Sequence, residues 1–284
     1  MLQVGAIEIA IVSDGVAHVD AGGMFGLVPR SLFRSVQEPD ANNLVPLALH
    51  CLLVRAAGKT IVIDTGYGTR LSLKAEQNLG LIRPNGGLVD GLARLGVSPD
   101  AIDIVINTHL HGDHCGGNTF TEGDTLRATF PNAEYVTQQR EYEDASHPNE
   151  RTRATYLPSN YEPLVKSGQM RLLTGDTEIV AGIHGIITPG HTAAHMIIRF
   201  ESEGQDALFM ADLATYAVHF ERLGWMTAYD VEPLVTLETK RHWQHWALEH
   251  NPLLIFQHDP TILVGRLMSD GEKFRVESVQ TSVA

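Results

Sequence analysis

The stretch INTHLHGDHCGG (Ile106–Gly117) concentrates three histidines and an aspartate between His109 and His114. It follows directly on the apolar run Ile102–Ile106, which we predict to be a buried strand. Polar residues of the kind that bind ligands, placed where a strand ends, are typical of sites in α/β proteins. The stretch therefore predicts an α/β fold with a metal site at the edge of a sheet.

The histidine cluster has the spacing H-x-H-x-D-H. In an extended chain, residues two apart face the same way, so His109 and His111 can converge on one metal ion. Gly112 allows a sharp turn, after which Asp113 and His114 can face a second ion. A hydrolytic zinc takes about four ligands and leaves one position to water. Further ligands must therefore come from distant parts of the chain.

Three distant residues repeat the same placement, a ligand-type side chain after a predicted strand and beside a turn residue. They are His191 in TPGHT after Ile183–Thr188, Asp212 in LFMADL after Ala207–Met210, and His258 in FQHDP after Leu253–Phe256. A single histidine at a strand end is more often packed or on the surface than bound to metal. Four repetitions of the pattern favour a metal site.

The rest of the chain alternates strands and helices. We predict further strands at Ile7–Gly15, in two runs of Leu47–Gly68 joined at Gly58-Lys59, and at Met196–Phe200, with helices at about 86–95 and 231–250. Residues 131–168 are charged, aromatic and broken by prolines, and we predict them to be a helical cap insertion over the site. The strand-rich halves around it predict a single domain, 1–284, of two packed sheets with helices outside.

Composition limits the partners. The chain has 284 residues, 34 acidic against 21 basic, and a formal net charge of −13. This balance disfavours binding to nucleic acid or to an anionic membrane. The two cysteines, Cys51 and Cys115, give no disulfide framework. With no signal-peptide pattern and no apolar run of about 18 residues, we expect a cytoplasmic protein, and the sequence leaves a homodimer open.

The chain resembles the metallo-β-lactamase-fold hydrolase superfamily in a series of motifs. These are VIDTGYG (Val62–Gly68), H-x-H-x-D-H, PGH, the later Asp and HD. Within it, DAGGMFGLVP (Asp20–Pro29), NERTRATYLP (Asn149–Pro158) and ADLATYAVHFERLGWMTAYDVEP (Ala211–Pro233) are similar to bacterial quorum-quenching N-acyl homoserine lactonases and related organophosphate hydrolases. The resemblance covers nearly the whole chain and implies an αββα sandwich of two mixed sheets with helices on the outer faces.

The resemblance also implies the ligand set. One metal would be held by His109, His111 and His191, the other by Asp113, His114 and His258, with Asp212 bridging both. A carboxylate has two oxygens and can span ions about 3.5–4 Å apart, which agrees with a bridging Asp. Imidazole and carboxylate ligands suit zinc, and they also accept cobalt, manganese or iron.

Other residues are expected around the metals. Asp64 would orient a ligand histidine through its free N–H, and His219 would pack nearby or support the ligands. Tyr216 would assist the substrate carbonyl, although it lies four residues after Asp212, whereas the family places its tyrosine three residues after that Asp. Apolar pocket walls are expected from Met24, Phe25, Tyr161 and Trp225.

The expected function is a dinuclear metal hydrolase that opens lactone rings by attack of a metal-bridging hydroxide, with catalytic roles for Asp113, Asp212 and Tyr216. One alternative is a phosphotriesterase or arylesterase that uses the same hydroxide. Another, from a different class, is a non-catalytic metal-binding or sensing module. Structural zinc sites are usually closed and often contain cysteine, so seven N and O ligands shared by two ions favour catalysis.

Overall fold

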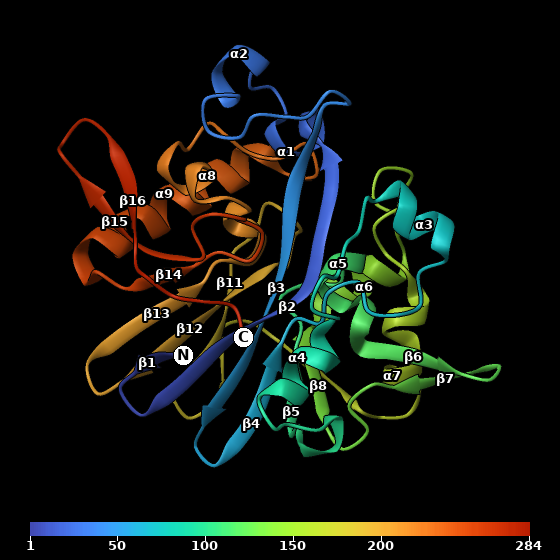
Figure 1. Ribbon diagram of the computed structural model, residues 1–284. Helices are drawn as coiled ribbons and strands as arrows, with labels where there is room; N and C mark the ends of the chain where they lie inside the picture. Colours follow the sequence, from blue (N-terminus) through green and yellow to red (C-terminus); the bar gives the residue numbers. More distant parts are fainter.

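Two seven-stranded sheets pack against each other in the computed structural model, which describes residues 1–284 (Figure 1). In the first sheet the pairs up to β3–β4 are antiparallel, and β4–β5, β5–β8 and β8–β9 are parallel. In sheet order, its strands are β1 (Leu2–Val4), β2 (Ile7–Asp20), β3 (Leu44–Ala56), β4 (Lys59–Ile63), β5 (Ile104–Ile106), β8 (Glu134–Gln138) and β9 (Met170–Leu173).

The second sheet is antiparallel except for the parallel pair β13–β14. In sheet order, its strands are β10 (Thr177–Val180), β11 (Ile183–Ile187), β12 (Met196–Ser202), β13 (Gln205–Phe209), β14 (Leu253–Ile255), β15 (Val264–Ser269) and β16 (Phe274–Ser278). A separate hairpin consists of β6 (Thr119–Glu122) and β7 (Thr125–Ala128).

Helices connect the strands and cover the outer faces of the sandwich. The α-helices are α1 (Ala21–Phe25), α2 (Arg30–Phe33), α3 (Leu73–Asn78), α4 (Leu88–Arg94), α5 (Gly112–Cys115), α6 (Gln139–Ser146), α7 (Glu162–Lys166), α8 (Ala217–Glu221) and α9 (Pro233–His250). The 3-10 turns are η1 (Pro99–Ala101), η2 (Gly116–Asn118), η3 (Pro158–Asn160) and η4 (Ala211–Ala214). None of the helices is both long and apolar enough to cross a membrane.

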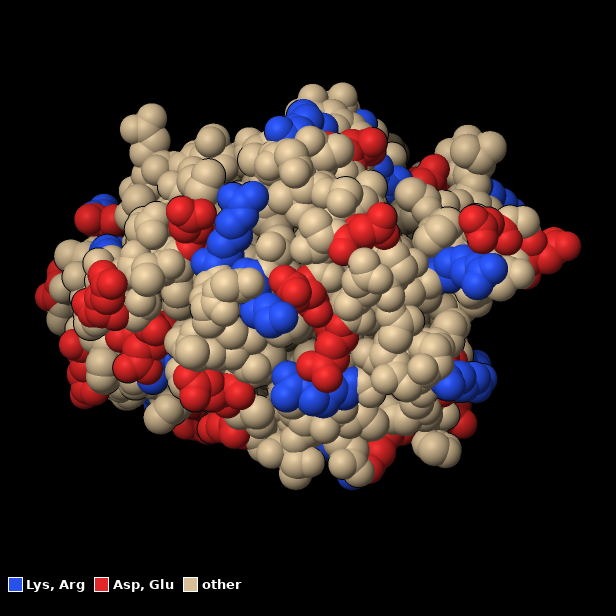
Figure 2. Space-filling model, turned by 90° about the horizontal axis from the view of Figure 1, so that it is seen from below, with Lys and Arg blue, Asp and Glu red and all other residues tan.

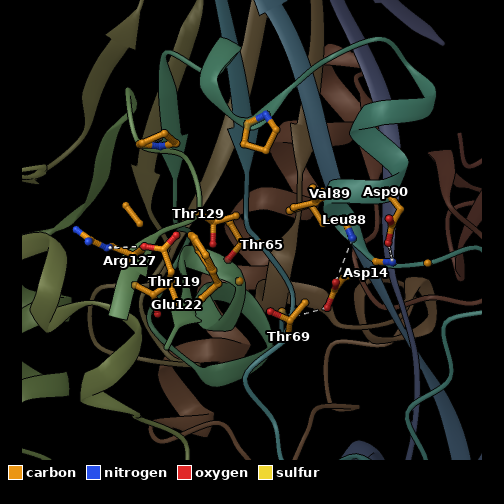
Figure 3. Close-up of a pocket in the computed structure, with 18 of the residues that line it drawn as sticks. Asp14, Thr65, Thr69, Leu88, Val89, Asp90, Thr119, Glu122, Arg127 and Thr129 are labelled. Atoms are coloured by element: carbon orange, nitrogen blue, oxygen red, sulfur yellow. Dashed lines mark hydrogen bonds and ion pairs between the residues drawn. The ribbon is translucent and has the colours of Figure 1, made fainter. Parts of the chain in front are cut away.

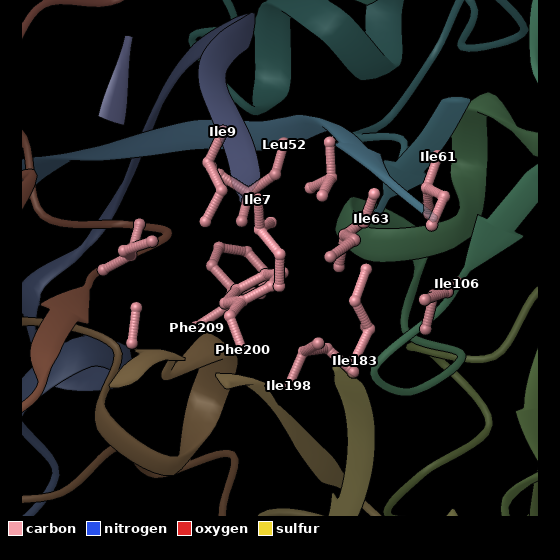
Figure 4. Close-up of a cluster of buried hydrophobic side chains, with 14 of the residues drawn as sticks. Ile7, Ile9, Leu52, Ile61, Ile63, Ile106, Ile183, Ile198, Phe200 and Phe209 are labelled. Carbon is pink, nitrogen blue, oxygen red and sulfur yellow. The ribbon is translucent and has the colours of Figure 1, made fainter. Parts of the chain in front are cut away.

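The main core lies between the two sheets (Figure 4). In β4, Ile61 and Ile63 point into this layer, while Val62 between them faces the opposite side of the sheet. Because successive strand residues face opposite sides and both sides are covered here, the buried part of β4, Ile61–Ile63, is apolar throughout, as expected for a strand inside a sheet covered on both faces. Phe200 and Phe209 fill the layer from the second sheet.

Each outer face has its own core. Leu88 and Leu92 of α4 pack on the first sheet, and Trp243 and Ala247 of α9 pack on the second. The order helix, sheet, sheet, helix confirms the αββα sandwich that the sequence predicts. Burying these apolar side chains stabilises the fold by roughly 25 cal/mol per Å² removed from water.

The segment 131–168 differs in part from the predicted helical cap. Residues 134–138 form β8, which lies between β5 and β9 inside the first sheet, and Tyr135 and Val136 are fully buried. The predicted cap therefore begins too early, because a short strand inside a charged segment lacks a long hydrophobic signal. Only the later part, with α6, η3 and α7, lies outside the sheet.

Strand direction decides where the loops open. β4 and β5 run parallel in one sheet, and β13 and β14 run parallel in the other. β11 runs in the same direction as β13, because both are antiparallel to β12. The connections that follow β5, β11, β13 and β14 carry all seven metal-ligand candidates, and the connection after β4 carries Asp64, so the sandwich gathers these residues at one edge.

Candidate metal centre

The histidine cluster begins three residues after β5 ends. His109 precedes a short extended piece that ends at His111, and α5 begins at Gly112. The backbone N–H of Gly112 donates to the carbonyl of Thr155. On the other side the chain touches the connection after β4, where a Cβ on Gly117 would lie 2.3 Å from the carbonyl oxygen of Thr65. The loop is therefore packed on both sides and holds its histidines rigidly.

The seven predicted ligands meet in two groups. His109, His111, His191 and Asp212 place their donor atoms within 4.8 Å of one another, and so do Asp113, His114 and His258. His111 Nδ1 lies 3.1 Å from His191 Nε2, and His114 Nε2 lies 3.2 Å from His258 Nε2. Side chains from four connections across both sheets thus converge at one point.

Asp212 lies where the two groups touch. Its Oδ2 is 3.0 Å from His191 Nε2, while its Oδ1 is 3.1 Å from His258 Nε2. The same Oδ2 is 3.4 Å from His114 Nε2 and 3.9 Å from His109 Nε2. Oδ2 therefore faces histidines of both groups, and Oδ1 faces His258 of the second group.

The donor set fits divalent cations. Nε2 of His109 is buried, points into the first group and has no hydrogen-bond partner. Such an orphaned nitrogen costs free energy unless something binds it. Burial, and after it the neighbouring histidines, lowers the pKa of both His109 and His111 well below the usual value. Both rings are therefore neutral and have a lone pair for a metal.

The carboxylates draw positive charge to the same point. Burial lowers the pKa of His191, but Asp212 and Asp230 outweigh it and raise that pKa to about 10. For Asp212 the histidines outweigh burial, and its pKa lies well below the usual value. A cation held between these groups satisfies the same electrostatic demand.

Two of the histidines are oriented by buried carboxylates. His114 Nδ1 lies 2.9 Å from Asp64 Oδ2, and His191 Nδ1 lies 2.8 Å from Asp230 Oδ1. A donor nitrogen on that side leaves Nε2 as the free acceptor, which is how such partners fix a ligand histidine. Asp64 has a left-handed backbone, with φ of 54°, which the surrounding bonds to Thr108 maintain.

Two other histidines use uncharged partners. His258 Nδ1 lies 2.6 Å from the carbonyl oxygen of Ala48, and His109 Nδ1 lies 3.2 Å from the hydroxyl of Thr108. His195, which we did not place among the ligands, has another task. Its Nε2 accepts a hydrogen bond from the backbone N–H of Asp212 at 3.1 Å. This bond fixes the backbone of Asp212, whose carboxylate lies between the two groups.

Tyr216 and His219 lie beside each other near the start of α8. The Tyr216 hydroxyl donates to the carbonyl of Pro46 at 2.8 Å, and its ring is buried against Phe25. His219 Nδ1 accepts from the backbone N–H of Tyr216, and burial lowers the pKa of His219 to about 3. The structure places this pair in packing next to the centre.

The predicted pocket walls divide into two places. Met24 and Phe25 are buried in one cluster with Tyr216, and Trp225 packs at its edge. Tyr161 is fully buried elsewhere, under α5, and its hydroxyl donates to the carbonyl of Ala145. Tyr161 thus supports the histidine loop from beneath, because the segment that follows η3 turns inward there.

Sequence reasoning missed residues that lie close to the ligands. Asp230 is separated by 39 residues from the histidine that it contacts. Glu141 sits in a segment that we predicted to be a cap. Tyr67 is half-buried, and burial, followed by the carboxylate of Asp113, raises the pKa of its phenol well above the usual value. The only available signal was that Tyr67 belongs to the VIDTGYG motif.

A large cavity lies behind the histidine loop rather than at the candidate metal ligands (Figure 3). It has a volume of about 900 Å³ and is bounded by the connection after β4, the start of α4 and the β6–β7 hairpin. Thr65 and Gly117 separate it from the ligands, and Asp14 on its wall is paired with Arg83 at 3.2 Å.

Comparison with known proteins gives consistent relatives. The family model of the metallo-beta-lactamase superfamily matches residues 44–264. An N-acyl homoserine lactonase from Bacillus sp is 28% identical over 234 residues, which are 76% of this chain and 83% of the relative. The chain therefore matches most of the length of that curated protein.

Two solved structures are similar over nearly their whole length. A "probable metal-dependent hydrolase" from Staphylococcus aureus is 30% identical, with a TM-score of 0.90 over 99% of this chain and 100% of that one. AidC, a dizinc quorum-quenching lactonase with a bound product, has a TM-score of 0.83 over 99% of this chain and 97% of its own. At 17% identity, the likeness to AidC is one of fold.

Proposed function

This chain belongs to the metallo-beta-lactamase superfamily as a metal-dependent hydrolase, and we propose that it opens lactone rings of the N-acyl homoserine lactone type with two divalent ions. The observation that carries the proposal is the convergence of seven nitrogen and oxygen ligands in two groups that meet at Asp212. The lactonase relatives supply the substrate class.

The ligand set divides between the two ions. His109, His111 and His191 would hold one, Asp113, His114 and His258 the other, and Asp212 both. When bound, such ions polarise a carbonyl and lower the pKa of water towards neutrality. We propose zinc, because neutral imidazole and carboxylate suit it and because the neighbour AidC is a dizinc lactonase. Cobalt, manganese and iron accept the same ligands.

Asp113 is the ligand through which the site reaches solvent. It is half-buried, whereas the other six ligands are buried. We propose that Asp113 accepts the proton that the attacking water loses and passes it to the ring oxygen that leaves, since its carboxylate is the one that both substrate and water can reach. Tyr67, whose phenol stays protonated next to Asp113, would donate a hydrogen bond at the same place.

A role for Tyr216 at the substrate carbonyl requires its hydroxyl to leave the carbonyl of Pro46 when substrate binds. If it does so, Tyr216→Phe lowers kcat by about tenfold, equivalent to about 1.4 kcal/mol. We expect this result from steady-state kinetics, with Tyr67→Phe measured in parallel. An unchanged kcat for Tyr216→Phe would remove that hydroxyl from the reaction.

The function is tested with zinc-loaded protein and a panel of substrates. Ring opening of N-hexanoyl homoserine lactone and simple γ-lactones is followed in a pH-stat, beside a paraoxon-type triester, with metal content measured on the same sample. We expect kcat/KM for at least one acyl homoserine lactone to exceed that for the triester. Two bound zinc ions without lactone turnover would refute the proposal, and a preference for the triester would indicate a phosphotriesterase.

A further inference from the structure

A buried carboxylate outside the ligand set lies directly beneath the metal centre. Glu141 is in the first turn of α6, which begins where β8 ends at the same edge of the sheet as the ligand loops. Its side chain has no exposed surface. The next acidic residues of the helix, Glu143 and Asp144, instead pair with Gln139 and Arg140 along the outer side.

Three donors from three different segments bind this carboxylate. Oε1 accepts the backbone N–H of Leu110 at 3.0 Å and the phenol of Tyr156 at 3.0 Å. Oε2 accepts the hydroxyl of Thr192 at 2.6 Å. A buried carboxylate is costly to desolvate. The three hydrogen bonds to Glu141 offset part of this cost and fix the position of its side chain.

The donors stand next to the ligands of one ion. Leu110 separates His109 from His111, and Thr192 directly follows His191. Tyr156 belongs to the later part of the 131–168 segment, where it forms an isolated β-bridge with His111, and its ring centroid lies 5.1 Å from that of His111 in a tilted arrangement. One carboxylate therefore joins the histidine loop of the first sheet to the PGHT loop of the second.

No such tie joins the ligands of the other ion. His114 and His258 are fixed separately, by Asp64 and by the carbonyl of Ala48. We propose that Glu141 is a positioning residue that sets the separation of His111 and His191 and thereby the affinity of one ion of the pair. This inference rests on the metal ligation in the proposed function, but not on the substrate.

The test compares Glu141→Gln with Glu143→Gln, a matched change on the exposed side of the same helix. Zinc is titrated into each apo-protein against a chelating indicator, so that two affinities are obtained without any substrate. We expect Glu141→Gln to lower the affinity for one of the two zinc ions by about tenfold to a hundredfold, which is the range for partners that orient metal ligands. The affinity for the second ion should stay within about twofold of the wild-type value. Both zinc affinities of Glu143→Gln should do the same, because that side chain touches no ligand.

A purely structural role would give a different result. If Glu141→Gln lowers the melting temperature but leaves both zinc affinities unchanged, or weakens both ions equally, the inference is wrong. Because the readout is zinc binding, inactivity towards lactones would refute the proposed function and leave this result standing.

A second variant covers the case in which Glu141→Gln does not fold. Thr192→Val removes one donor and keeps the shape of the side chain. It should weaken the same ion severalfold, whereas Thr177→Val, on β10 in the second sheet, should not. If Glu141→Gln folds, the double variant Glu141→Gln/Thr192→Val should lose no more zinc affinity than Glu141→Gln alone. Both substitutions act on the same contact, the bond between Thr192 and Glu141, so their effects should not add. Additive losses, or an unaffected first ion in Thr192→Val, would contradict the proposal.

Discussion

Asp212 is the one residue that faces both halves of the ligand set, through Oδ2 towards His191 and Oδ1 towards His258. We predict that Asp212→Ala loses at least one metal equivalent and most of the activity, because neither group of histidines keeps its shared carboxylate. Metal content by plasma mass spectrometry and turnover of a lactone check this. Two retained ions with normal turnover would exclude a bridging role.

At the residue scale, the proposed ligands carry a clearer sequence signal than the residues that support them. The H-x-H-x-D-H cluster and three isolated residues were recognisable because each follows a strand at a turn, and all seven meet in the structure. Asp230, Glu141 and Thr192 carry no such local signal. Their roles depend on which distant loop they touch, and only the packed sheets decide that.

Pocket residues were harder for the same reason. Tyr161 has an aromatic side chain of the kind expected in a pocket wall, yet it is buried beneath α5. An aromatic side chain fits a cavity wall and a core equally well. The difference lies in the path of the backbone, which a short irregular segment does not reveal.

At the scale of elements, the loop between β11 and β12 depends on Gly190. Its φ is 136°, and a Cβ there would lie 2.3 Å from Thr236 Oγ1 on α9. We predict that Gly190→Ala displaces His191 and costs more than about 2 kcal/mol of unfolding free energy, through strain and overpacking. Urea denaturation and zinc titration measure both effects.

The matched control is Gly204→Ala in the β12–β13 turn. Its φ is 74°, but nothing lies within 4 Å of the added Cβ. It should cost only about 1 kcal/mol, the left-handed penalty alone, and leave zinc binding unchanged. Equal losses for the two variants would mean that crowding at Gly190 is not what holds the loop.

His50 on β3 predicts how stability depends on pH. Burial lowers its pKa to about 4, against about 6.5 in the unfolded chain. The folded state thus binds fewer protons between these values, and unfolding free energy falls as the pH drops from about 6.5 to about 4.

We expect the part due to His50 to be about 2 kcal/mol between pH 7.5 and pH 5. Urea denaturation of the metal-free wild type and His50→Gln at both pH values isolates it, since other histidines contribute equally to both proteins. The wild type should lose more stability than the variant. Parallel losses would show that His50 titrates normally.

Elements with clear periodicity were predictable, and short ones were not. The helix expected at about 231–250 is α9, Pro233–His250, and the strand expected at Ile183–Thr188 is β11. β8 was hidden because five residues between charged segments give too little pattern. Such a strand forms because β5 and β9 offer it hydrogen-bonding edges on both sides.

At the scale of the whole molecule, the metal centre joins the two sheets. Ions bound there are held by the folded state only, so their removal should lower stability. With free zinc about 1,000-fold above Kd, one ion contributes about 4 kcal/mol, which for a domain of this size corresponds to about 8 °C in Tm. Thermal unfolding with and without EDTA tests this. An unchanged Tm after verified metal loss would contradict it.

The charged side chains are distributed over the surface in a way that the net charge alone does not reveal. Although the formal charge is −13, acidic and basic side chains lie interspersed on the face in Figure 2. Across the whole surface, several acidic and basic side chains form ion pairs, among them Lys59 with Asp103 and Arg171 with Glu134. The two-sheet architecture was predictable from alternating apolar strands. The pairing of the surface charges was not, because it depends on neighbours in space.

The proposed ligands are spread from His109 to His258 along the chain, so the full set exists only after synthesis has passed His258. A nascent polypeptide on the ribosome has the first cluster early but lacks the last histidine until β14 has been made. In this proposal, the ion held by Asp113, His114 and His258 can bind fully only after the other ion's ligands have been made. A chain that stopped before His258 would lack one proposed ligand of the second ion, even if its first sheet had formed.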